Sequence, residues 1–319
     1  MTKVDIISGF LGAGKTTFIK ELIEKVFAGE KLVLIENEFG EIGIDGGFLQ
    51  DAGIEITEMN SGCICCTLVG DFSVALKKVL DEYHPDHVII EPSGVGKLSD
   101  VAAAIENVKE DADIEIEGRI TVVDGKKAKM YLDNFGEFFE NQVEHASTIV
   151  ISRTQNMTDE KIEACVHLLR EKNDKATIIS TPWDQLSGDA IRHALEHGAE
   201  IEGLFEHHHD HDEECSCGCG HHHHHHADEV FTSWGKETAH KYTEEELDYL
   251  LKALSETDAY GTILRSKGII QMTDGNWKQF DLVPQEYEVR DGNADYAGRM
   301  VVIGTDLKED ELAKLFHVQ

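Results

Sequence analysis

GFLGAGKTT, at residues 9–17, fits the pattern G-x-x-x-x-G-K-[ST], directly after a β-branched run and at the start of a stretch with helical spacing. Glycines in this pattern let backbone N–H groups converge on a phosphate at a helix N-terminus, where Lys15 adds positive charge. The hydroxyl of Thr16 can ligate Mg²⁺ there. The stretch therefore predicts a nucleotide phosphate site formed by Gly9, Gly12, Ala13, Gly14, Lys15, Thr16 and Thr17.

Short β-branched runs alternate with longer amphipathic stretches from residue 3 to about residue 200. This alternation predicts an α/β fold, with a doubly wound, mostly parallel sheet of the P-loop NTPase class and helices on both faces. The expected strands are 4–8, 32–36, 54–59, 87–91, 120–124, 148–152 and 177–180, and the expected helices are 15–27, 68–83, 101–109 and 159–172.

The segment 206–229 breaks this alternation, because it consists mainly of His, Asp, Glu, Cys and Gly and has almost nothing to bury. Beyond it we expect helices at 244–254 and 307–316 and strands at 261–270, 276–282, 286–289 and 299–303. We therefore predict three parts: a P-loop GTPase domain over 1–204, a metal-binding linker rich in His, Cys and acidic residues over 205–229, and a small α+β domain over 230–319.

The chain of 319 residues carries 62 acidic and 29 basic side chains, a formal net charge of -33. This charge repels phosphodiester backbones and anionic lipid, so nucleic acid and membranes are not expected partners. No apolar segment follows a basic start and no run approaches the ~20 residues of a membrane span, so we expect a cytoplasmic location. Six of the seven cysteines fall into two clusters, which indicates metal binding, whereas Cys165 is expected in the core.

Two further segments have the composition of nucleotide switches. The strand 87–91 ends in Glu91-Pro92-Ser93-Gly94, which predicts a carboxylate near Mg²⁺ and a glycine, Gly94, near the γ-phosphate. Segment 36–47 combines carboxylates with glycines and is expected to order around Mg²⁺ and the γ-phosphate, with 92–98 as the second switch. The catalytic residues are predicted to be Lys15, Thr16, Glu91 and, for orienting the attacking water, Glu41 or another switch carboxylate.

A cysteine motif, GCICC at residues 62–66, lies between an expected strand and an expected helix. Its thiols are therefore expected at the same edge of the sheet as the phosphates. Thiolates suit Zn²⁺ or Cu(I), and a carboxylate from the first switch can complete a mixed, exchangeable site. Alternatively, the thiols are buried and inert. The candidate ligands are Cys63, Cys65, Cys66, Glu38 and Glu41, besides Thr16 and Glu91 for Mg²⁺.

The linker offers more ligands than one defined metal site can use. Its residues are expected to load or buffer metal, and imidazole with thiolate favours Zn²⁺, Ni²⁺ or Co²⁺ over Mg²⁺. The alternative is a solvated low-complexity segment that binds metal only incidentally. The candidate ligands are His207, His208, His209, His211, Cys215, Cys217, Cys219, His221, His222 and His223, with the histidine run continuing to His226.

Four motifs occur in the order GFLGAGKTT, ENEFGEIGID, GCICC and EPSGVGKLSDV, and they resemble the CobW-like family of P-loop GTPases, metallochaperones and metal insertases. The resemblance covers about the first 180 residues, and the stretch 231–316 is similar to the small C-terminal domain of that family. It implies GTP hydrolysis coupled to the transfer of Zn²⁺, Co²⁺ or a related metal into a client apoprotein. It also implies that Cys65 and Cys66 belong to the transfer site.

The guanine-reading N-K-x-D motif of that family is replaced here by Ser152-Arg153-Thr154-Gln155. Gln155 has no carboxylate to accept two guanine N–H groups, although its amide oxygen can accept one such bond. Ser180 opens a Ser-Thr-Pro segment that can offer a backbone N–H to the guanine O6. The base is thus expected at Ser152, Arg153, Gln155 and Ser180, and the choice between GTP and ATP stays open.

These observations predict a nucleotide-dependent metallochaperone that hydrolyses GTP with Mg²⁺ and delivers Zn²⁺, Co²⁺ or Ni²⁺ to a client apo-metalloprotein or metal-cofactor enzyme. Two alternatives remain. The missing guanine carboxylate favours an ATP-using phosphotransferase or ATPase, and the linker favours a metal buffer or sensor with nucleotide binding. The sequence does not decide the metal, the client, the ligating cysteines or the oligomeric state, for which a homodimer is one option.

Overall fold

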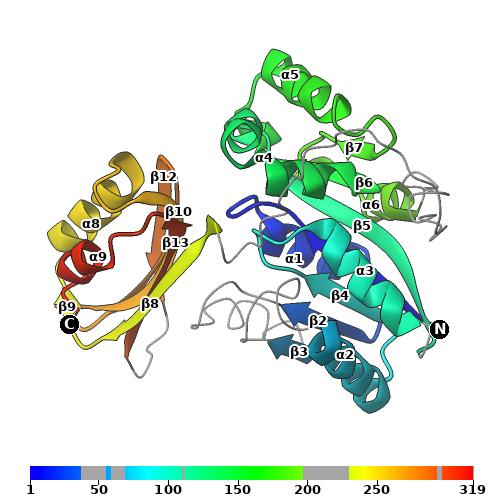
Figure 1. Cartoon of the computed structure of the whole chain (residues 1–319), viewed down its shortest axis with the longest axis horizontal. Helices are drawn as coiled ribbons and strands as arrows, with labels where there is room; N and C mark the ends of the chain where they lie inside the picture. Colours follow the sequence, from blue (N-terminus) through cyan, green and yellow to red (C-terminus); the bar gives the residue numbers. More distant parts are fainter. Residues whose placement is uncertain (37–54, 59–68, 110–111, 197–229, 293–296, 319) are drawn as a thin grey trace, which may run out of the picture.

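The computed structural model describes residues 1–36, 55–58, 69–109, 112–196, 230–292 and 297–318 (Figure 1). An N-terminal sheet of seven strands has the order β3-β2-β4-β1-β5-β6-β7, and its pairings are parallel. This confirms the predicted α/β class. The strands are β1 (Thr2–Ser8), β2 (Leu32–Glu36), β3 (Glu55–Glu58), β4 (His87–Glu91), β5 (Ile114–Asp124), β6 (Thr148–Ser152) and β7 (Thr177–Ile179).

Helices cover both faces of this sheet (Figure 1). One face packs against α2 (Val69–Tyr83), α3 (Leu98–Lys109), α4 (Ala128–Glu144) and α5 (Asp159–Arg170), and the other against α1 (Lys15–Lys25) and α6 (Gly188–Glu196). Strand β1 shows the division, since Ile6 belongs to the first apolar cluster and Ile7 to the second. Both faces are buried, which explains why its strands are apolar runs rather than alternating ones.

Two helices of this domain, α4 and α6, were not expected from the sequence. Helix α4 contains Gly136 and several aromatic residues, which are weaker helix formers than Ala or Leu, and its backbone is kinked at Phe135. Tertiary packing overrides these preferences: the Tyr131 ring of α4 lies 4.6 Å from the Phe10 ring of the P-loop. The helix is therefore stabilised by tertiary contacts that cannot be predicted from the helix preferences of its own residues.

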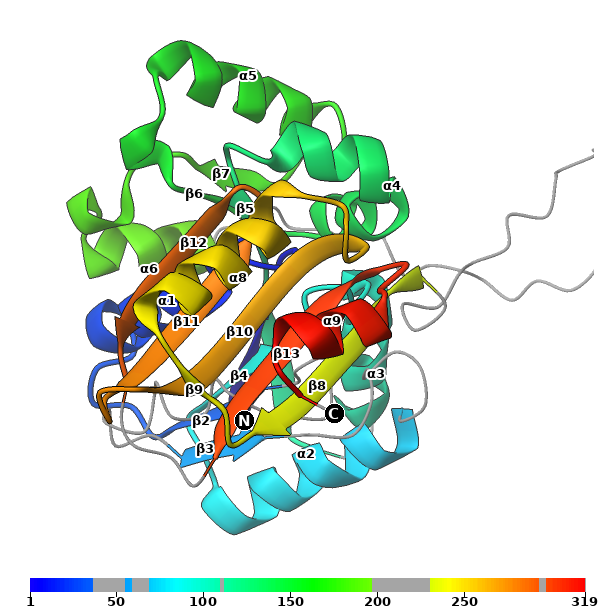
Figure 2. The same cartoon turned by 90° about the vertical axis from the view of Figure 1, so that its left-hand side faces the viewer.

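A second sheet forms the C-terminal domain, and α8 (Glu244–Glu256) and α9 (Glu309–Leu315) lie on one of its faces (Figure 2). Its antiparallel strands follow the order β12-β11-β10-β13-β8, while β9 adds a short parallel pairing to β10. The predicted small α+β domain is confirmed, although β8 and β9 were not expected. The strands are β8 (Thr232–Thr238), β9 (Lys241–Tyr242), β10 (Thr262–Met272), β11 (Trp277–Val283), β12 (Glu286–Asp291) and β13 (Gly298–Thr305).

Aromatic side chains connect the two domains. The Phe231 ring lies 6.2 Å from Phe10 and 5.0 Å from Phe138, with the centroids as reference points. Val301 and Ile303 of β13 belong to the same apolar cluster. The predicted boundaries at 204 and 230 stay predictions, because residues 197–229 lie outside the described ranges.

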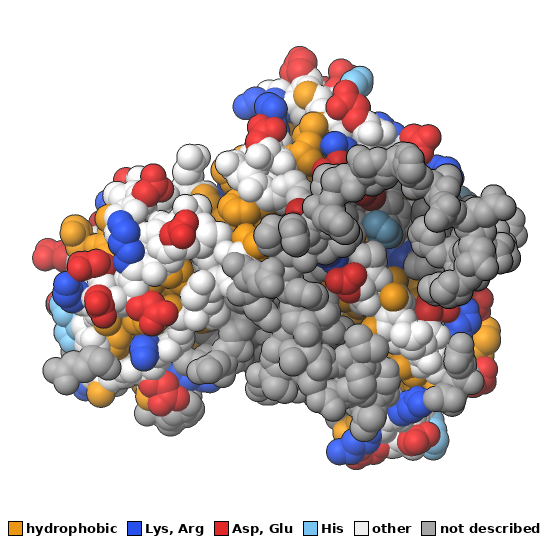
Figure 3. Space-filling model, viewed as in Figure 1, with side chains coloured by type: hydrophobic (Ala, Val, Ile, Leu, Met, Phe, Trp, Pro, Cys, Tyr) orange, Lys and Arg blue, Asp and Glu red, His pale blue; other side chains and the backbone are white. Residues whose placement is uncertain are grey.

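Acidic and basic side chains intermix over the described surface of both domains on the face drawn in Figure 3. Within the described ranges, none of the helices combines the length and apolar character needed to cross a bilayer.

Candidate nucleotide-binding site

The P-loop joins the end of β1 to the start of α1. Gly14 precedes the helix with φ 99°, a left-handed conformation that favours glycine, and no side-chain hydrogen bond caps the helix. Gly9 has φ 144°, and a Cβ at this position would lie 2.3 Å from the carbonyl oxygen of Val122. The loop is therefore restricted to glycine at these points, and it presents the N–H groups of the first helical turn to a ligand.

Lys15, Thr16 and Glu91 line one pocket, as the sequence predicts. Lys15 is buried, and its Nζ donates to the carbonyl oxygen of Gly9 at 3.0 Å. The same Nζ lies 3.9 Å from Oε1 of Glu91, whose side chain is 13% exposed at the end of β4. Adjacent parallel strands end at one edge of the sheet, so β1 and β4 deliver a cation, a hydroxyl and a carboxylate to a common point.

Basic side chains gather in this pocket although the chain as a whole is strongly acidic. The pocket has a volume of about 220 Å³. Positive charge and uncapped helical N–H groups at one place are the features of an anion site, so the pocket suits the phosphates of a nucleotide. Its basic residues are Lys15, Lys20, Arg153, Arg265 and Arg290, against the acidic residues Glu91, Asp281, Glu286 and Glu288.

The segment predicted to read the base follows β6. Arg153 adopts a left-handed conformation with φ 64°. Its Nε lies 3.1 Å from Oδ2 of Asp124, and its Nη2 donates to the carbonyl oxygen of Gly12 at 3.4 Å. Ser152 is buried with its hydroxyl bonded to the backbone, whereas Gln155 is exposed. Of the predicted base contacts, Arg153 lines the phosphate pocket, while roles for Ser152, Gln155 and Ser180 stay predictions.

Burial acts on the carboxylate that anchors Arg153. Asp124, at the end of β5, is 1% exposed, and this burial raises the pKa of its carboxyl above the usual value, while Arg153 and Lys127 oppose the shift. Its Oδ1 accepts a hydrogen bond from the Lys126 amide at 2.9 Å. Asp124 was not predicted as a site residue, and its place at the end of a buried strand was the available signal.

The predicted second switch, residues 92–98, is buried throughout. The Nε2 of Gln142 on α4 donates to the carbonyl oxygens of Gly94 at 3.2 Å and Gly96 at 2.8 Å. A Cβ added to Gly94 would lie 2.9 Å from Cδ2 of Leu11, so the turn packs directly against the P-loop. Gln142 therefore positions this segment, a role that is not visible in the sequence because α4 was not expected.

Residues of the C-terminal domain complete the pocket, which the sequence did not predict. Val283 packs on the P-loop so closely that a Cβ at Gly12 would lie 2.1 Å from its Cγ1. Glu286 on β12 forms an ion pair with Arg153, and the Nζ of Lys127 lies 3.9 Å from the same Glu286 oxygen. The candidate nucleotide pocket is thus lined by residues of both domains.

The remaining predicted metal ligands lie outside the described residues. These are Glu38, Glu41, Cys63, Cys65, Cys66 and all the linker histidines and cysteines. The strands that precede the first switch and the cysteine motif are nevertheless described: β2 ends at Glu36 and β3 at Glu58, paired in register, and Glu36 is also paired with Glu91. Strands β2 and β3 therefore end at the edge of the sheet where Glu91 and the P-loop lie.

The parallel sheet, the uncapped helix after a glycine loop and the buried Lys15 beside Glu91 define a P-loop nucleotide-binding protein. The chain belongs to the family described as CobW/HypB/UreG, nucleotide-binding domain, whose model matches residues 3–180. A second model, the cobalamin synthesis protein cobW C-terminal domain, matches residues 231–318. The family expected from the four sequence motifs is therefore confirmed.

Individual relatives share part of this chain. A zinc chaperone CobW from Sinorhizobium sp is 37% identical over 177 residues, covering 47% of this chain and 50% of the relative. A zinc chaperone YeiR from Escherichia coli is 30% identical over 203 residues, covering 64% and 57%. The chain thus spans about half the length of these curated relatives. The zinc-bound YjiA GTPase from E. coli is a similar solved structure, with 22% identity, coverage of 99% and 98%, and a TM-score of 0.45.

Proposed function

We propose that this protein is a nucleotide-dependent metallochaperone, which hydrolyses GTP to control the binding of a transition metal, Zn²⁺ or alternatively Co²⁺ or Ni²⁺, and its delivery to a client apo-metalloprotein. The observation that carries the proposal is the common sheet edge. The P-loop and Glu91 lie there, and the strands leading to the acidic switch and to the cysteine motif end there. A change at the γ-phosphate can therefore reach metal ligands through neighbouring segments.

Different described residues would bind the phosphates, bind Mg²⁺ and respond to the γ-phosphate. Lys15 and the first-turn N–H groups of α1 hold the phosphates, while Arg265 and Arg290 add positive charge from the C-terminal domain. Thr16 and Glu91 would supply oxygen ligands to Mg²⁺, and that ion would neutralise part of the phosphate charge. The backbone of Gly94, which accepts a hydrogen bond from Gln142, would respond to the γ-phosphate.

Zinc as the cargo is supported by the names of the relatives, which include zinc chaperones and a zinc-regulated GTPase metalloprotein activator of Schizosaccharomyces pombe. Thiolate ligands from Cys63, Cys65 and Cys66 suit that metal. The linker over 205–229 would load or buffer the same ion. In this proposal a client apo-metalloprotein or metal-cofactor enzyme docks on the protein to receive the metal, and a homodimer of the chain is one option for the assembly that delivers it.

A second candidate function is an ATPase or ATP-dependent phosphotransferase. Gln155 favours it, because an exposed amide cannot supply the carboxylate that discriminates guanine. The two functions differ in their product and in the nucleotide they prefer. A phosphotransferase transfers the phosphate of ATP to an acceptor, whereas the chaperone releases free phosphate from GTP. Phosphate release measured with GTP and with ATP, with Lys15→Ala as the inactive reference, distinguishes them.

The proposed coupling is tested by titrating Zn²⁺, with the free ion fixed by a chelator, with and without a non-hydrolysable GTP analogue. The titration uses a variant from which residues 206–226 have been deleted, so that metal binding by the linker does not mask binding at the cysteine motif. The nucleotide should change the zinc affinity, and Cys65→Ser/Cys66→Ser should abolish that change. Cys165→Ala, which removes a buried thiol of α5, is the matched control and should leave it intact. Nucleotide-independent zinc binding would exclude the coupled switch and favour a metal buffer.

A further inference from the structure

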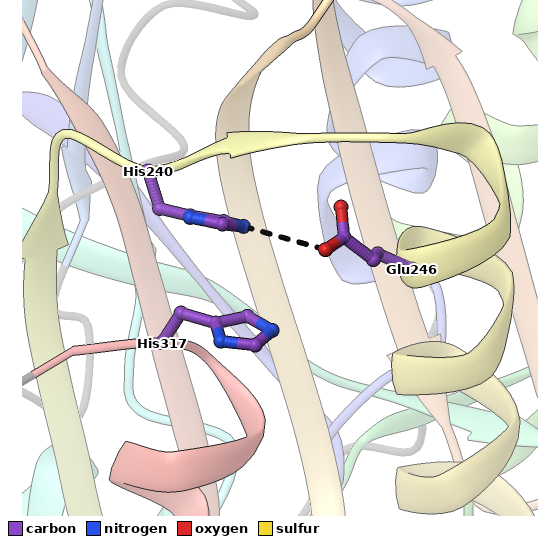
Figure 4. A group of neighbouring side chains, drawn as sticks. All are labelled: His240, Glu246 and His317. Atoms are coloured by element: carbon purple, nitrogen blue, oxygen red, sulfur yellow. Dashed lines mark ion pairs between the residues drawn. The ribbon is translucent and has the colours of Figure 1, made fainter.

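Three metal-ligating side chains from separate elements converge on the C-terminal domain (Figure 4). His240 lies between β8 and β9, Glu246 in the first turn of α8, and His317 after α9. One ligand atom from each lies within 4.8 Å of the others. The imidazole rings of His240 and His317 lie with their centroids 4.4 Å apart, and both point toward the Glu246 carboxylate.

The spacing of these atoms fits a bound ion better than direct contact. His240 Nε2 and Glu246 Oε1 are 3.8 Å apart, which is too long for a hydrogen bond. In a tetrahedral zinc site with bonds of about 2.0–2.2 Å, the ligand atoms are about 3.4 Å apart. Within the described residues, His240 Nε2 is shielded from solvent and has no hydrogen-bond partner. A bound cation would satisfy that nitrogen if His240 Nε2 and Glu246 Oε1 approached from 3.8 Å to about 3.4 Å.

Local structure holds the three residues in place. Thr243 and Glu246 form a capping box, in which one carboxylate oxygen of Glu246 accepts from the Thr243 amide at 2.8 Å and the other faces His240. The hydroxyl of Tyr242 donates to the carbonyl oxygen of Phe316 at 2.6 Å, which fixes the backbone near His240 beside that near His317. The ligands are therefore positioned before any ion binds.

A second group of the same residue types shows the contrast. Asp5, His87 and Glu117 also lie within reach of one another. There, however, the imidazole of His87 is hydrogen-bonded directly to Asp5 at 2.7 Å, and Glu117 forms an ion pair with Lys3. Both ring nitrogens of His87 already face carboxylates, those of Asp5 and Glu30, so we assign this group no ion, although Asp5 Oδ1 has no hydrogen-bond partner among the described residues.

We propose that His240, Glu246 and His317 bind a divalent transition metal of the Zn²⁺, Co²⁺ or Ni²⁺ class. Two imidazoles and one carboxylate suit these ions better than Mg²⁺ and leave a fourth position open for exchange. The side chains of His240 and Glu246 are 31% and 39% exposed, so the group lies at the surface of the domain, with His240 Nε2 itself covered.

The proposed site is separate from the nucleotide pocket. Helices α8 and α9 pack on one face of the C-terminal sheet, whereas Val301 and Ile303 on the other face belong to the cluster shared with the N-terminal domain. The site uses neither the cysteine motif nor the linker. It does not rest on GTP hydrolysis, and it would give the chain a metal-exchange point on its outer side (Figure 1).

The test is residue-resolved histidine modification by diethylpyrocarbonate, read by mass spectrometry on the full chain. Free Zn²⁺ is fixed with nitrilotriacetate, because the His- and Cys-rich linker is expected to compete for metal, and Mg²⁺ serves as the non-binding ion. His240 and His317 should lose reactivity together, with one common midpoint, while exposed His84 stays reactive. Protection of neither histidine, or protection at clearly different zinc concentrations, would overturn the proposal.

Glu246→Gln is the decisive variant, because glutamine also forms a capping box and the helix should keep its N-terminal contacts. It should shift the common midpoint to about tenfold higher zinc or more, with a melting curve in chelator like that of the wild type. Glu245→Gln, an exposed acid in the same helical turn, should leave the midpoint unchanged. An unshifted midpoint in Glu246→Gln would show that the carboxylate is no ligand and would exclude the three-residue site.

Discussion

Replacing Arg153 with glutamine should destabilise the protein by leaving a buried charge without its partner. The Nε of Arg153 lies 3.1 Å from Oδ2 of Asp124, whose side chain is 1% exposed. Removing one partner of a buried pair costs about 3–5 kcal/mol, and we expect about 2–3 kcal/mol here because Arg153 is 25% exposed and Lys127 stays near Asp124. Glu286→Gln breaks the second ion pair of Arg153 and should cost less than about 1 kcal/mol, since Glu286 is 47% exposed.

The loss of unfolding free energy in Arg153→Gln should depend on pH. Burial already raises the pKa of Asp124 in the folded state above its unfolded value of 3.8, and loss of the arginine raises it further. Below that folded pKa the native state holds a proton that the unfolded chain releases, so the deficit should shrink as the pH is lowered from 8 toward 5. Urea unfolding at both pH values measures the difference in unfolding free energy between the variant and the wild type. The double variant Arg153→Gln/Asp124→Asn should recover most of the lost stability. A deficit that is equal at both pH values, or no larger than that of Glu286→Gln, would refute the reasoning.

Three other predictions follow from single positions. Gln155→Asp should raise affinity for GTP over ATP by roughly tenfold or more, because a carboxylate accepts two guanine N–H groups, whereas equal gains for both nucleotides in competition assays would contradict base reading by this residue. Gly94→Ala should weaken nucleotide binding about tenfold in the same assay, since its Cβ would displace Leu11, while Gly136→Ala, with no atom nearer than 3.8 Å, should not. Burial raises the pKa of Cys165 to about 11 from 9.0, so the wild type should lose about 2 kcal/mol of unfolding free energy as the pH rises from 9 to 11. Urea unfolding of Cys165→Ala should lack that part of the slope, and an identical slope would show that the thiol titrates normally.

Local patterns determined the N-terminal domain to a large degree. The P-loop pattern fixes a strand, a glycine turn and a helix in succession, and the structure places Lys15 at the start of α1 as expected. Strands buried on both faces produce apolar runs that are visible without any partner, which is why β2, β4 and β6 agree with the predicted bounds. Glu91 was predicted for the same reason, because it follows such a run directly. Helix α4 was missed since aromatic packing, and not local preference, forms it.

Only the tertiary structure decided which distant residues meet. Glu286 and Arg153 are far apart in the sequence, and no local pattern predicts that a strand of the C-terminal domain closes the nucleotide pocket. His240, Glu246 and His317 are likewise far apart in the sequence, and the fold brings them together from the turn between β8 and β9, from α8 and from the segment after α9. The physical reason is that backbone periodicity and glycine conformations are short-range properties, whereas a pocket or a ligand set depends on which buried faces pack against one another.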